Sequence, residues 1–189
     1  HPRPAVQSYR GANIAVTVPA SLEHNLKQLA QQHNVTLFML LLASFQALLH
    51  HYSRQSDIRV GVPVANRNRV ETERLLGFFV NTQVLRARFD ESLSFSELLA
   101  QVKQTALDAQ AHQDLPFEQL VEALQPERNL SISPLFQVMY NHLKEHQDST
   151  TVQLAPASSL DVEGIRWGSR TAQFDLTFST FESTQGLSA

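Results

Sequence analysis

The residues best suited to chemistry lie in the sequence HQDLPFE that begins at His112. Pro116 favours the start of a helix there, Asp114 is placed to cap that helix, and Glu118 lies where the helix dipole favours a carboxylate. Helix formation therefore explains these three residues without a functional role. It does not explain His112 and Gln113, which we keep as candidates that line or support an active site.

Asn81, Thr82 and Gln83 are polar residues inside an apolar, strand-like run, FFVNTQVLRARF, at residues 78–89. Buried polar groups normally find hydrogen-bond partners, so local bonding at a bend explains Asn81 and Thr82 structurally. A position on the wall of a binding site is the functional alternative.

Arg67 follows another apolar strand, at a place where strand ends in α/β proteins commonly meet ligands. The structural alternative is an exposed ion pair with Glu71 or Glu73. Such a pair contributes only about 0–1 kcal/mol.

Two histidine patterns are weaker candidates. His50 and His51 fall at the end of a predicted helix, where histidine suits the helix dipole. His142 and His146 match the H-x-x-E-H pattern of some zinc peptidases, but that pattern requires both histidines on one helical face, and here it follows a strand-like run. We predict no metal site. The sequence has no cysteine, so it predicts no disulfide, thiolate chemistry or cysteine–zinc site. Its six glycines do not form the pattern of a phosphate-binding loop.

Length and composition predict one core. The chain has 189 residues, 42% of them hydrophobic and 17% charged, which suits a single domain or lobe. A formal charge of -3 supplies no cationic field for nucleic acid or anionic lipid. The longest apolar run, residues 37–49, is shorter than the roughly 20 residues of a membrane span. We expect a cytoplasmic protein without nucleic-acid or membrane partners.

The periodicity of apolar residues predicts a mixed α/β fold, with a sheet packed against helices. The helix at residues 36–52 is apolar on nearly every face and must be covered on both sides. Ser94 and Glu97 have the spacing of a capping box, and the segment 19–21 offers a helix cap. The predicted helices are 21–32, 36–52, 94–111 and 117–124, the predicted strands are 13–19, 57–65, 78–89, 135–141 and 174–181, with weaker strands at 152–154 and 160–165, and the predicted loops are 66–74 and 126–134.

Four segments resemble signature motifs of the condensation domains of nonribosomal peptide synthetases. GVPVANR at 61–67 is similar to G-x-P-V-A-G-R, and LGFFVNTQVLR at 76–86 contains a sequence similar to G-x-F-V-N-T. HQDLPFE at 112–118 is similar to H-Q-D-x-P-F-E, and RNLSISPLF at 128–136 to R-D-x-S-R-x-P-L-F. We call these the four motif segments. They stand in the family's order and at its approximate spacing.

The resemblance implies a fold of the chloramphenicol acetyltransferase type, in which two lobes meet along a tunnel. Donor and acceptor aminoacyl groups enter it from opposite ends on the phosphopantetheine arms of carrier proteins. A first-lobe motif, H-H-x-x-x-D-G, supplies the histidine that assists attack of the acceptor amine on the donor thioester. Here Asn66, Asn129 and Ile132 depart from the motifs, and no role is inferred for those side chains.

The histidine motif itself is missing from the sequence. The only histidine pair, His50 and His51, is followed by Gln55 and Ser56 where the motif requires Asp and Gly. The resemblance therefore implies the C-terminal lobe, with an inter-lobe linker at 1–12, the lobe at 13–189, the N-terminal lobe absent and the C-terminal end truncated. This lobe is expected to form the tunnel wall and the acceptor side and to be inactive alone.

The resemblance also assigns residues and partners. Arg67 is expected to reach the aspartate of the missing motif as a bidentate pair. The expected residues of the tunnel wall or of active-site support are Asn81, Gln83, His112, Gln113 and Asp114. The chain itself is expected to bind no cofactor, with substrates carried on 4'-phosphopantetheine. The expected partners are the N-terminal lobe of the same domain, donor and acceptor peptidyl carrier domains and an adjacent adenylation domain.

Two alternatives stay open. The first is a noncatalytic docking module for carrier proteins or neighbouring synthetase domains. The second is a coenzyme A-dependent acyltransferase of the same fold. Epimerisation and cyclisation relatives have other signatures, and FVNT at 79–82 favours ordinary condensation.

Overall fold

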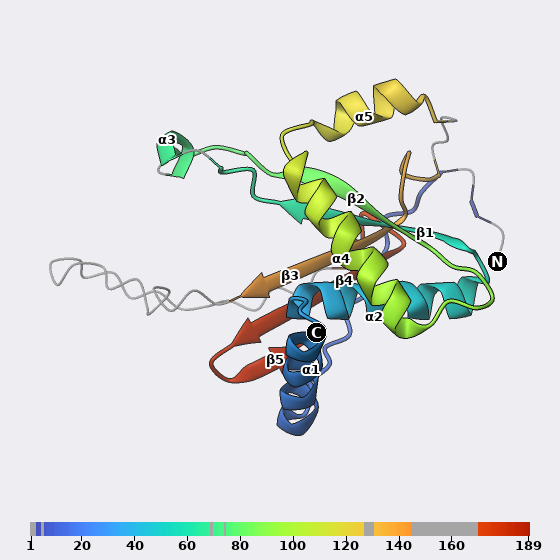
Figure 1. Ribbon diagram of the computed structural model, residues 1–189. Helices are drawn as coiled ribbons and strands as arrows, with labels where there is room; N and C mark the ends of the chain where they lie inside the picture. Colours follow the sequence, from blue (N-terminus) through green and yellow to red (C-terminus); the bar gives the residue numbers. More distant parts are fainter. Residues whose placement is uncertain (1–2, 5, 69, 74, 127–130, 145–169) are drawn as a thin grey trace, which may run out of the picture.

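A computed structural model describes residues 3–4, 6–68, 70–73, 75–126, 131–144 and 170–189. Helices and strands are interspersed along the chain (Figure 1). In order they are α1 (Ala20–Gln32), α2 (Leu37–Ser53), β1 (Asp57–Val64), α3 (Val70–Glu73), β2 (Asn81–Arg88), α4 (Phe95–Ala111), α5 (Phe117–Leu124), β3 (Val138–Lys144), β4 (Leu176–Ser183) and β5 (Gly186–Ser188).

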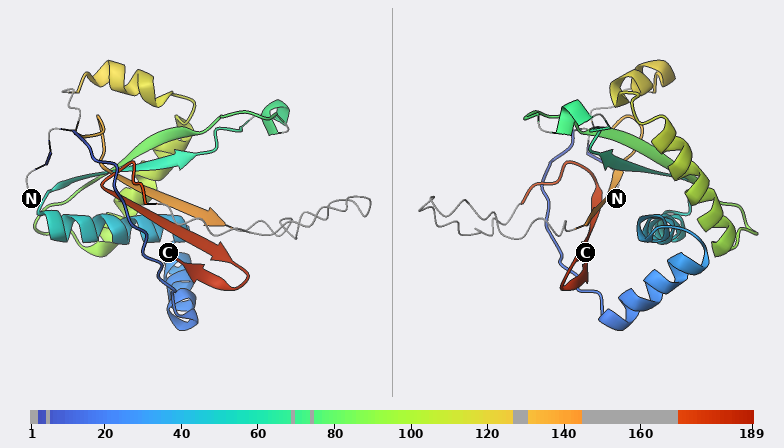
Figure 2. Two further views of the ribbon diagram at one scale, coloured as in Figure 1. Left: turned by 180° about the vertical axis from the view of Figure 1, so that it is seen from behind. Right: turned by 60° about the vertical axis from the view of Figure 1, so that its left-hand side comes forward.

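The strands form one mixed sheet in the order β2-β1-β3-β4-β5. β1 pairs antiparallel with β2 and parallel with β3, β3 pairs parallel with β4, and β4 turns back antiparallel into β5. Helices α1, α2 and α4 lie on one side of this sheet (Figure 2). The predicted mixed α/β fold is confirmed.

Helix α2 is the centre of the core, as its apolar composition predicts. It contacts α1, α4 and β1, so both of its sides are covered. Thr36 caps its first turn by accepting a hydrogen bond from the Met39 N–H at 3.2 Å, and Arg54 ends it in the left-handed conformation. No single helix in the described residues is long and apolar enough to span a membrane; only α1 and α2 taken together, bent by 102°, reach that length and composition.

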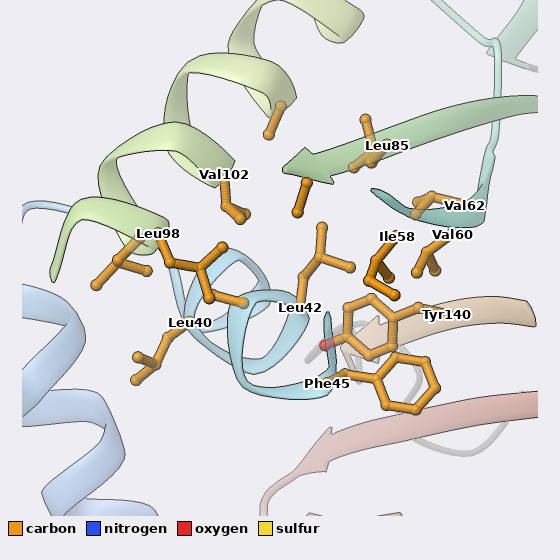
Figure 3. Packing of buried hydrophobic residues seen from close by; sticks show 14 of the residues in the cluster. Leu40, Leu42, Phe45, Ile58, Val60, Val62, Leu85, Leu98, Val102 and Tyr140 are labelled. Atoms are coloured by element: carbon orange, nitrogen blue, oxygen red, sulfur yellow. The ribbon is translucent and has the colours of Figure 1, made fainter. Parts of the chain in front are cut away.

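The core lies between α2, α4 and the sheet (Figure 3). Leu42 of α2, Val60 of β1 and Val102 of α4 are all fully or almost fully buried. Full burial of such a side chain contributes about 1.5–3 kcal/mol relative to exposure. Tyr140 of β3 closes the core with its ring stacked on Phe38 at 5.4 Å.

Helix α4 has the predicted capping box. Ser94 accepts a hydrogen bond from the Glu97 N–H at 3.3 Å, and the Glu97 carboxylate accepts one from the Ser94 N–H at 2.8 Å. The Ser94 hydroxyl and N–H together lower the pKa of Glu97. Farther along, Gln101 bonds both the N–H and the carbonyl of Arg88, which fixes α4 to β2.

Charged side chains attach α1 to the edge of the sheet formed by β4 and β5. Lys27 Nζ lies 2.7 Å from carboxylate oxygens of both Glu23 and Glu182. Glu23 also accepts a hydrogen bond from the Leu187 N–H at 3.0 Å. These contacts join α1 to β4 and β5.

The predicted strand at 13–19 is wrong. Thr17 forms only an isolated bridge with Ser188, and Ile14 is 86% exposed. Val16 and Val18 form backbone hydrogen bonds with residues 187–189. No described layer covers the segment, so the apolar residues of its alternating pattern stay exposed. The predicted cap at 19–21 is also not formed by a side chain: Pro19 is the N-cap of α1 and only its carbonyl bonds, to the Glu23 N–H.

Other element boundaries shift by a few residues. β2 begins at Asn81 instead of residue 78, because β1 ends at Val64, the partner of Asn81. The loop at 66–74 contains the short helix α3, and β5 was not predicted. The weaker strands at 152–154 and 160–165, and residues 127–130 of the loop at 126–134, lie outside the described residues.

Candidate functional site

The first, third and fourth motif segments meet around one aromatic side chain, Phe136. Its ring lies directly over Gly61 of β1, where a Cβ atom would approach the Phe136 ring to 2.3 Å. Phe117 at the start of α5 packs on the same ring in a T-shaped contact at 5.7 Å. Phe174 completes the cluster at 5.2 Å from Phe136. Gly61 is therefore a glycine because the backbone must approach an aromatic ring closely.

Asn81 joins the second and third motif segments. Its amide nitrogen donates hydrogen bonds to the carbonyls of Gln113 at 3.0 Å and Leu115 at 2.8 Å. Its amide oxygen accepts one from the Phe117 N–H at 3.1 Å. Asn81 thus holds the loop that carries His112 and Asp114, and it satisfies the first free N–H of α5.

Gln83 and Gln113 lie together at a cavity of about 310 Å³ between the ends of α2 and α4. Gln83 is further fixed by a hydrogen bond from its amide nitrogen to the Ala109 carbonyl. The remaining wall is largely apolar and includes Phe38 and Val62. With Gln110, these two glutamines supply neutral donors and acceptors to this cavity.

His112 and Asp114 are both exposed. His112 is the C-cap residue of α4 through its backbone, and its ring makes no hydrogen bond with the described residues. The prediction that Asp114 caps the next helix is wrong: the N-cap residue of α5 is Pro116, and the side chain that bonds the helix N–H is that of Asn81. Asp114 instead accepts a hydrogen bond from Asn68 at 3.1 Å.

Arg67 organises the connection between β1 and β2, residues 65–80, which we call the arm. Its Nη1 donates to the carbonyls of Thr72 and Leu75, the latter at 2.9 Å, and its Nη2 donates to the Gly77 carbonyl at 3.3 Å. The guanidinium also lies 4.2 Å from the centre of the Phe79 ring, a cation–π contact. These backbone contacts of Arg67 differ from the ion pair with Glu71 or Glu73 that the sequence left as the alternative.

The arm extends beyond the end of the sheet (Figure 2). Leu76 is fully exposed and Phe78 is 89% exposed. Arg67 therefore shapes a projection that carries exposed apolar side chains.

The pair His50 and His51 makes only local contacts with the described residues. His50 stacks on Phe89 at 4.2 Å and bonds the Gln55 carbonyl at 2.7 Å, and His51 contacts Tyr52 edge to face. His142 lies on β3, and His146 lies outside the described residues. Among the residues that the structure describes, no three His, Asp or Glu side chains gather as metal ligands would.

The site therefore consists of amides, an exposed imidazole and a fixed guanidinium, arranged to shape a surface. Sequence reasoning missed Asn68, Phe79 and the contact of Phe136 with Gly61. An isolated glycine within the apolar strand GVPV is a signal for close approach and could have predicted the last of these. Nothing in the local sequence indicates the other two.

The architecture is that of the chloramphenicol acetyltransferase-like fold. The condensation domain of the monacolin K polyketide synthase MokA superposes with a TM-score of 0.82 at 22% identity, covering 100% of this chain and 43% of that one. A four-domain nonribosomal peptide synthetase bound to AMP and glycine gives a TM-score of 0.86 at 28% identity, covering 100% of this chain and 15% of that one.

The family model described as Condensation domain matches residues 1–189, and the chain belongs to that family. A linear gramicidin synthase of Brevibacillus parabrevis is 50% identical over 191 residues, and surfactin synthase subunit 1 of Bacillus subtilis is 36% identical over 187. The chain spans only 2% and 5% of those two proteins, although they cover 100% and 99% of it.

Proposed function

We propose that the chain is the C-terminal lobe of a nonribosomal peptide synthetase condensation domain. It forms a wall and the acceptor side of the tunnel in which an amide bond joins two carrier-bound thioester substrates, and it is not catalytic alone. The observation that carries this proposal is the packing of the motif segments into one unit around Phe136 and Asn81, in a sequence without H-H-x-x-x-D-G.

The face of the sheet opposite α1, α2 and α4 supports a partner lobe. Successive residues of a strand point to opposite faces, so Leu143 and Phe181 point away from the helices that cover Tyr140. They are cross-strand partners on β3 and β4 and are 50% and 42% exposed. Together with Leu76 and Phe78 of the arm they give the apolar surface that a second lobe needs.

Arg67 is the proposed bridge to that lobe. A guanidinium has five N–H donors, of which the arm uses three, two on Nη1 and one on Nη2. Nε and one proton of Nη2 are left, and Nε and Nη2 share the edge of the group that binds a carboxylate in a bidentate manner. An aspartate of the partner lobe would be held there by an arginine already fixed in place.

The substrates and partners follow from the same proposal. Donor and acceptor groups arrive on 4'-phosphopantetheine arms of peptidyl carrier domains, and an adenylation domain adjoins them in the same synthetase. Two relatives are synthases of linear gramicidin and of surfactin by name, and the similar solved structure is a nonribosomal peptide synthetase of four domains. Asn81, Gln83, His112, Gln113 and Asp114 then support or line the tunnel.

The proposal is tested by Arg67→Ala and Arg67→Lys in the complete two-lobe domain, with the dipeptide product measured from loaded carriers. Arg88→Ala is the control, because Arg88 is an exposed arginine whose side chain makes no hydrogen bond or ion pair with the described residues. Both Arg67 variants should condense more slowly, since lysine keeps the charge but lacks the fork. If Arg67→Ala leaves both stability and condensation unchanged, the bridging role is wrong.

A further inference from the structure

Three side chains on the helical face of the sheet link the core to the surface. The Tyr140 hydroxyl lies 3.2 Å from Thr180 Oγ1, and Thr180 Oγ1 lies 2.7 Å from Nδ1 of His142. Tyr140 and Thr180 are 0% and 2% exposed, so water does not supply other partners for them. Tyr140 lies beside Phe45 in the core (Figure 3). Neither the motif segments nor the proposed function uses this chain of side chains.

Counting protons gives the chain a direction. The buried Tyr140 hydroxyl has one proton, and Thr180 is its only hydrogen-bond partner among the described residues, so Tyr140 donates to Thr180. The Thr180 proton is then free to be donated to Nδ1 of His142. The opposite direction leaves a buried hydroxyl proton without an acceptor, which is unfavourable. The neutral His142 ring therefore carries its proton on Nε2.

The surroundings of His142 favour its neutral form. Burial lowers the pKa of His142, Lys144 of the same strand lowers it further, and the Glu182 carboxylate of β4 acts in the opposite direction. Lys27 of α1 binds Glu182 at 2.7 Å, and α2 presents the uncharged Phe38 ring 6.3 Å from the imidazole.

His142 lines a cavity of about 470 Å³ between α1, α2 and the ends of β3 and β4. Val35, Leu37 and Phe38 form its apolar side. Lys27 and Lys144 outnumber Glu182 among the charged residues of its wall. Lys27 is held between Glu182 and Glu23, whereas Lys144 makes no ion pair with the described residues.

We propose that this cavity binds a small carboxylate that bears a hydrophobic group. The two carboxylate oxygens accept hydrogen bonds from His142 Nε2–H and Lys144 Nζ, and the hydrophobic group packs on Val35, Leu37 and Phe38. One neutral donor and the Lys144 ammonium group, which has no ion-pair partner among the described residues, match a singly charged anion better than a doubly charged phosphate. The proposal is independent of the condensation function.

The first test is the tautomer of His142, measured in the wild-type chain by long-range ¹⁵N–¹H correlations of the imidazole. A protonated Nε2 and a hydrogen-bonded, unprotonated Nδ1 are expected. Protonation of Nδ1 would overturn the proposal. This measurement needs no variant, so it remains decisive if a substitution disturbs the fold.

The second test is titration of the chain with 3-phenylpropionate, followed through the His142 ring signals. Saturable binding is expected. It should be about tenfold weaker in Lys144→Gln, which removes the ammonium donor, and in Thr180→Val, which removes the hydroxyl group that fixes the His142 proton on Nε2. Ser179→Ala, a neighbour that points to the other face of β4, should bind like wild type. The proposal is wrong if no saturable shift occurs, if 3-phenylpropionamide or inorganic phosphate binds equally well, or if Thr180→Val binds as tightly as wild type.

Discussion

The side-chain oxygen of Asn81 accepts a hydrogen bond from the backbone N–H of Phe117 at 3.1 Å, although the two residues are 36 positions apart. A residue at the first position of β2 thereby performs the part of a helix cap for α5. The amide nitrogen of Asn81 holds two carbonyls of the loop before that helix. The position of the loop is therefore set by the sheet and not by its own sequence.

Asn81→Ala should destabilise the chain by about 2 kcal/mol, because it removes three hydrogen bonds that each contribute roughly 0.5–1.5 kcal/mol. Urea denaturation measures the free energy of unfolding. Hydrogen exchange of the Phe117 amide should accelerate in the same variant. Asn68→Ala, which breaks one exposed contact with Asp114, is the matched control and should stay within about 0.5 kcal/mol of wild type. Equal stability of the two variants would contradict the role given to Asn81.

Gly61→Ala should cost about 1–3 kcal/mol, because the new methyl group meets the Phe136 ring at 2.3 Å. Gly77→Ala is the control, since its Cβ would approach only the edge of the half-buried arm residue Phe79, at 3.1 Å. Adding Phe136→Leu to Gly61→Ala should recover part of the loss relative to the sum of the single variants. Strict additivity in this double-mutant cycle would show that the two residues do not couple.

Acid should loosen α1 from the sheet. The hydrogen bonds from Lys27 hold the pKa values of both Glu23 and Glu182 below their usual range. A carboxyl group with a lowered folded-state pKa contributes stability above its unfolded pKa and loses it as pH falls through the folded value. The midpoint temperature of thermal unfolding, measured from pH 6 down to pH 3, should therefore fall less steeply in Lys27→Met than in wild type below about pH 4.5. An equally steep fall of the midpoint temperature in both proteins would contradict the effect of Lys27 on these two carboxylates.

Gln46→Glu should be destabilised most at high pH. Gln46 is 1% exposed; its amide nitrogen bonds the Leu85 carbonyl at 3.2 Å, while Oε1 has no partner among the described residues. A glutamate there has a raised folded-state pKa, so its stability is greatest below the unfolded pKa and declines as pH rises through the folded value. We expect a loss of about 3 kcal/mol or more at pH 7, measured by urea denaturation. Gln46→Met, which carries no charge, should show no such pH dependence.

Local sequence patterns correctly predicted those features that depend on residues close together in the chain. The apolar run of α2 and the Ser94–Glu97 capping box were both confirmed, because they depend on helical spacing. The strand at 13–19 failed because alternation indicates a possible strand but not a layer to cover it. Asp114 was wrongly assigned as a cap because its competitor, Asn81, comes from a distant strand. The convergence of the first, third and fourth motif segments on Phe136 required the tertiary fold.

The most direct test of the proposed function is amide bond formation by this chain with loaded donor and acceptor carriers, with and without the N-terminal lobe supplied separately. We predict no dipeptide from the chain alone and dipeptide formation when a lobe bearing H-H-x-x-x-D-G is added. Appreciable dipeptide from the isolated chain would contradict the account, and so would failure of the two lobes together under conditions in which the continuous domain is active.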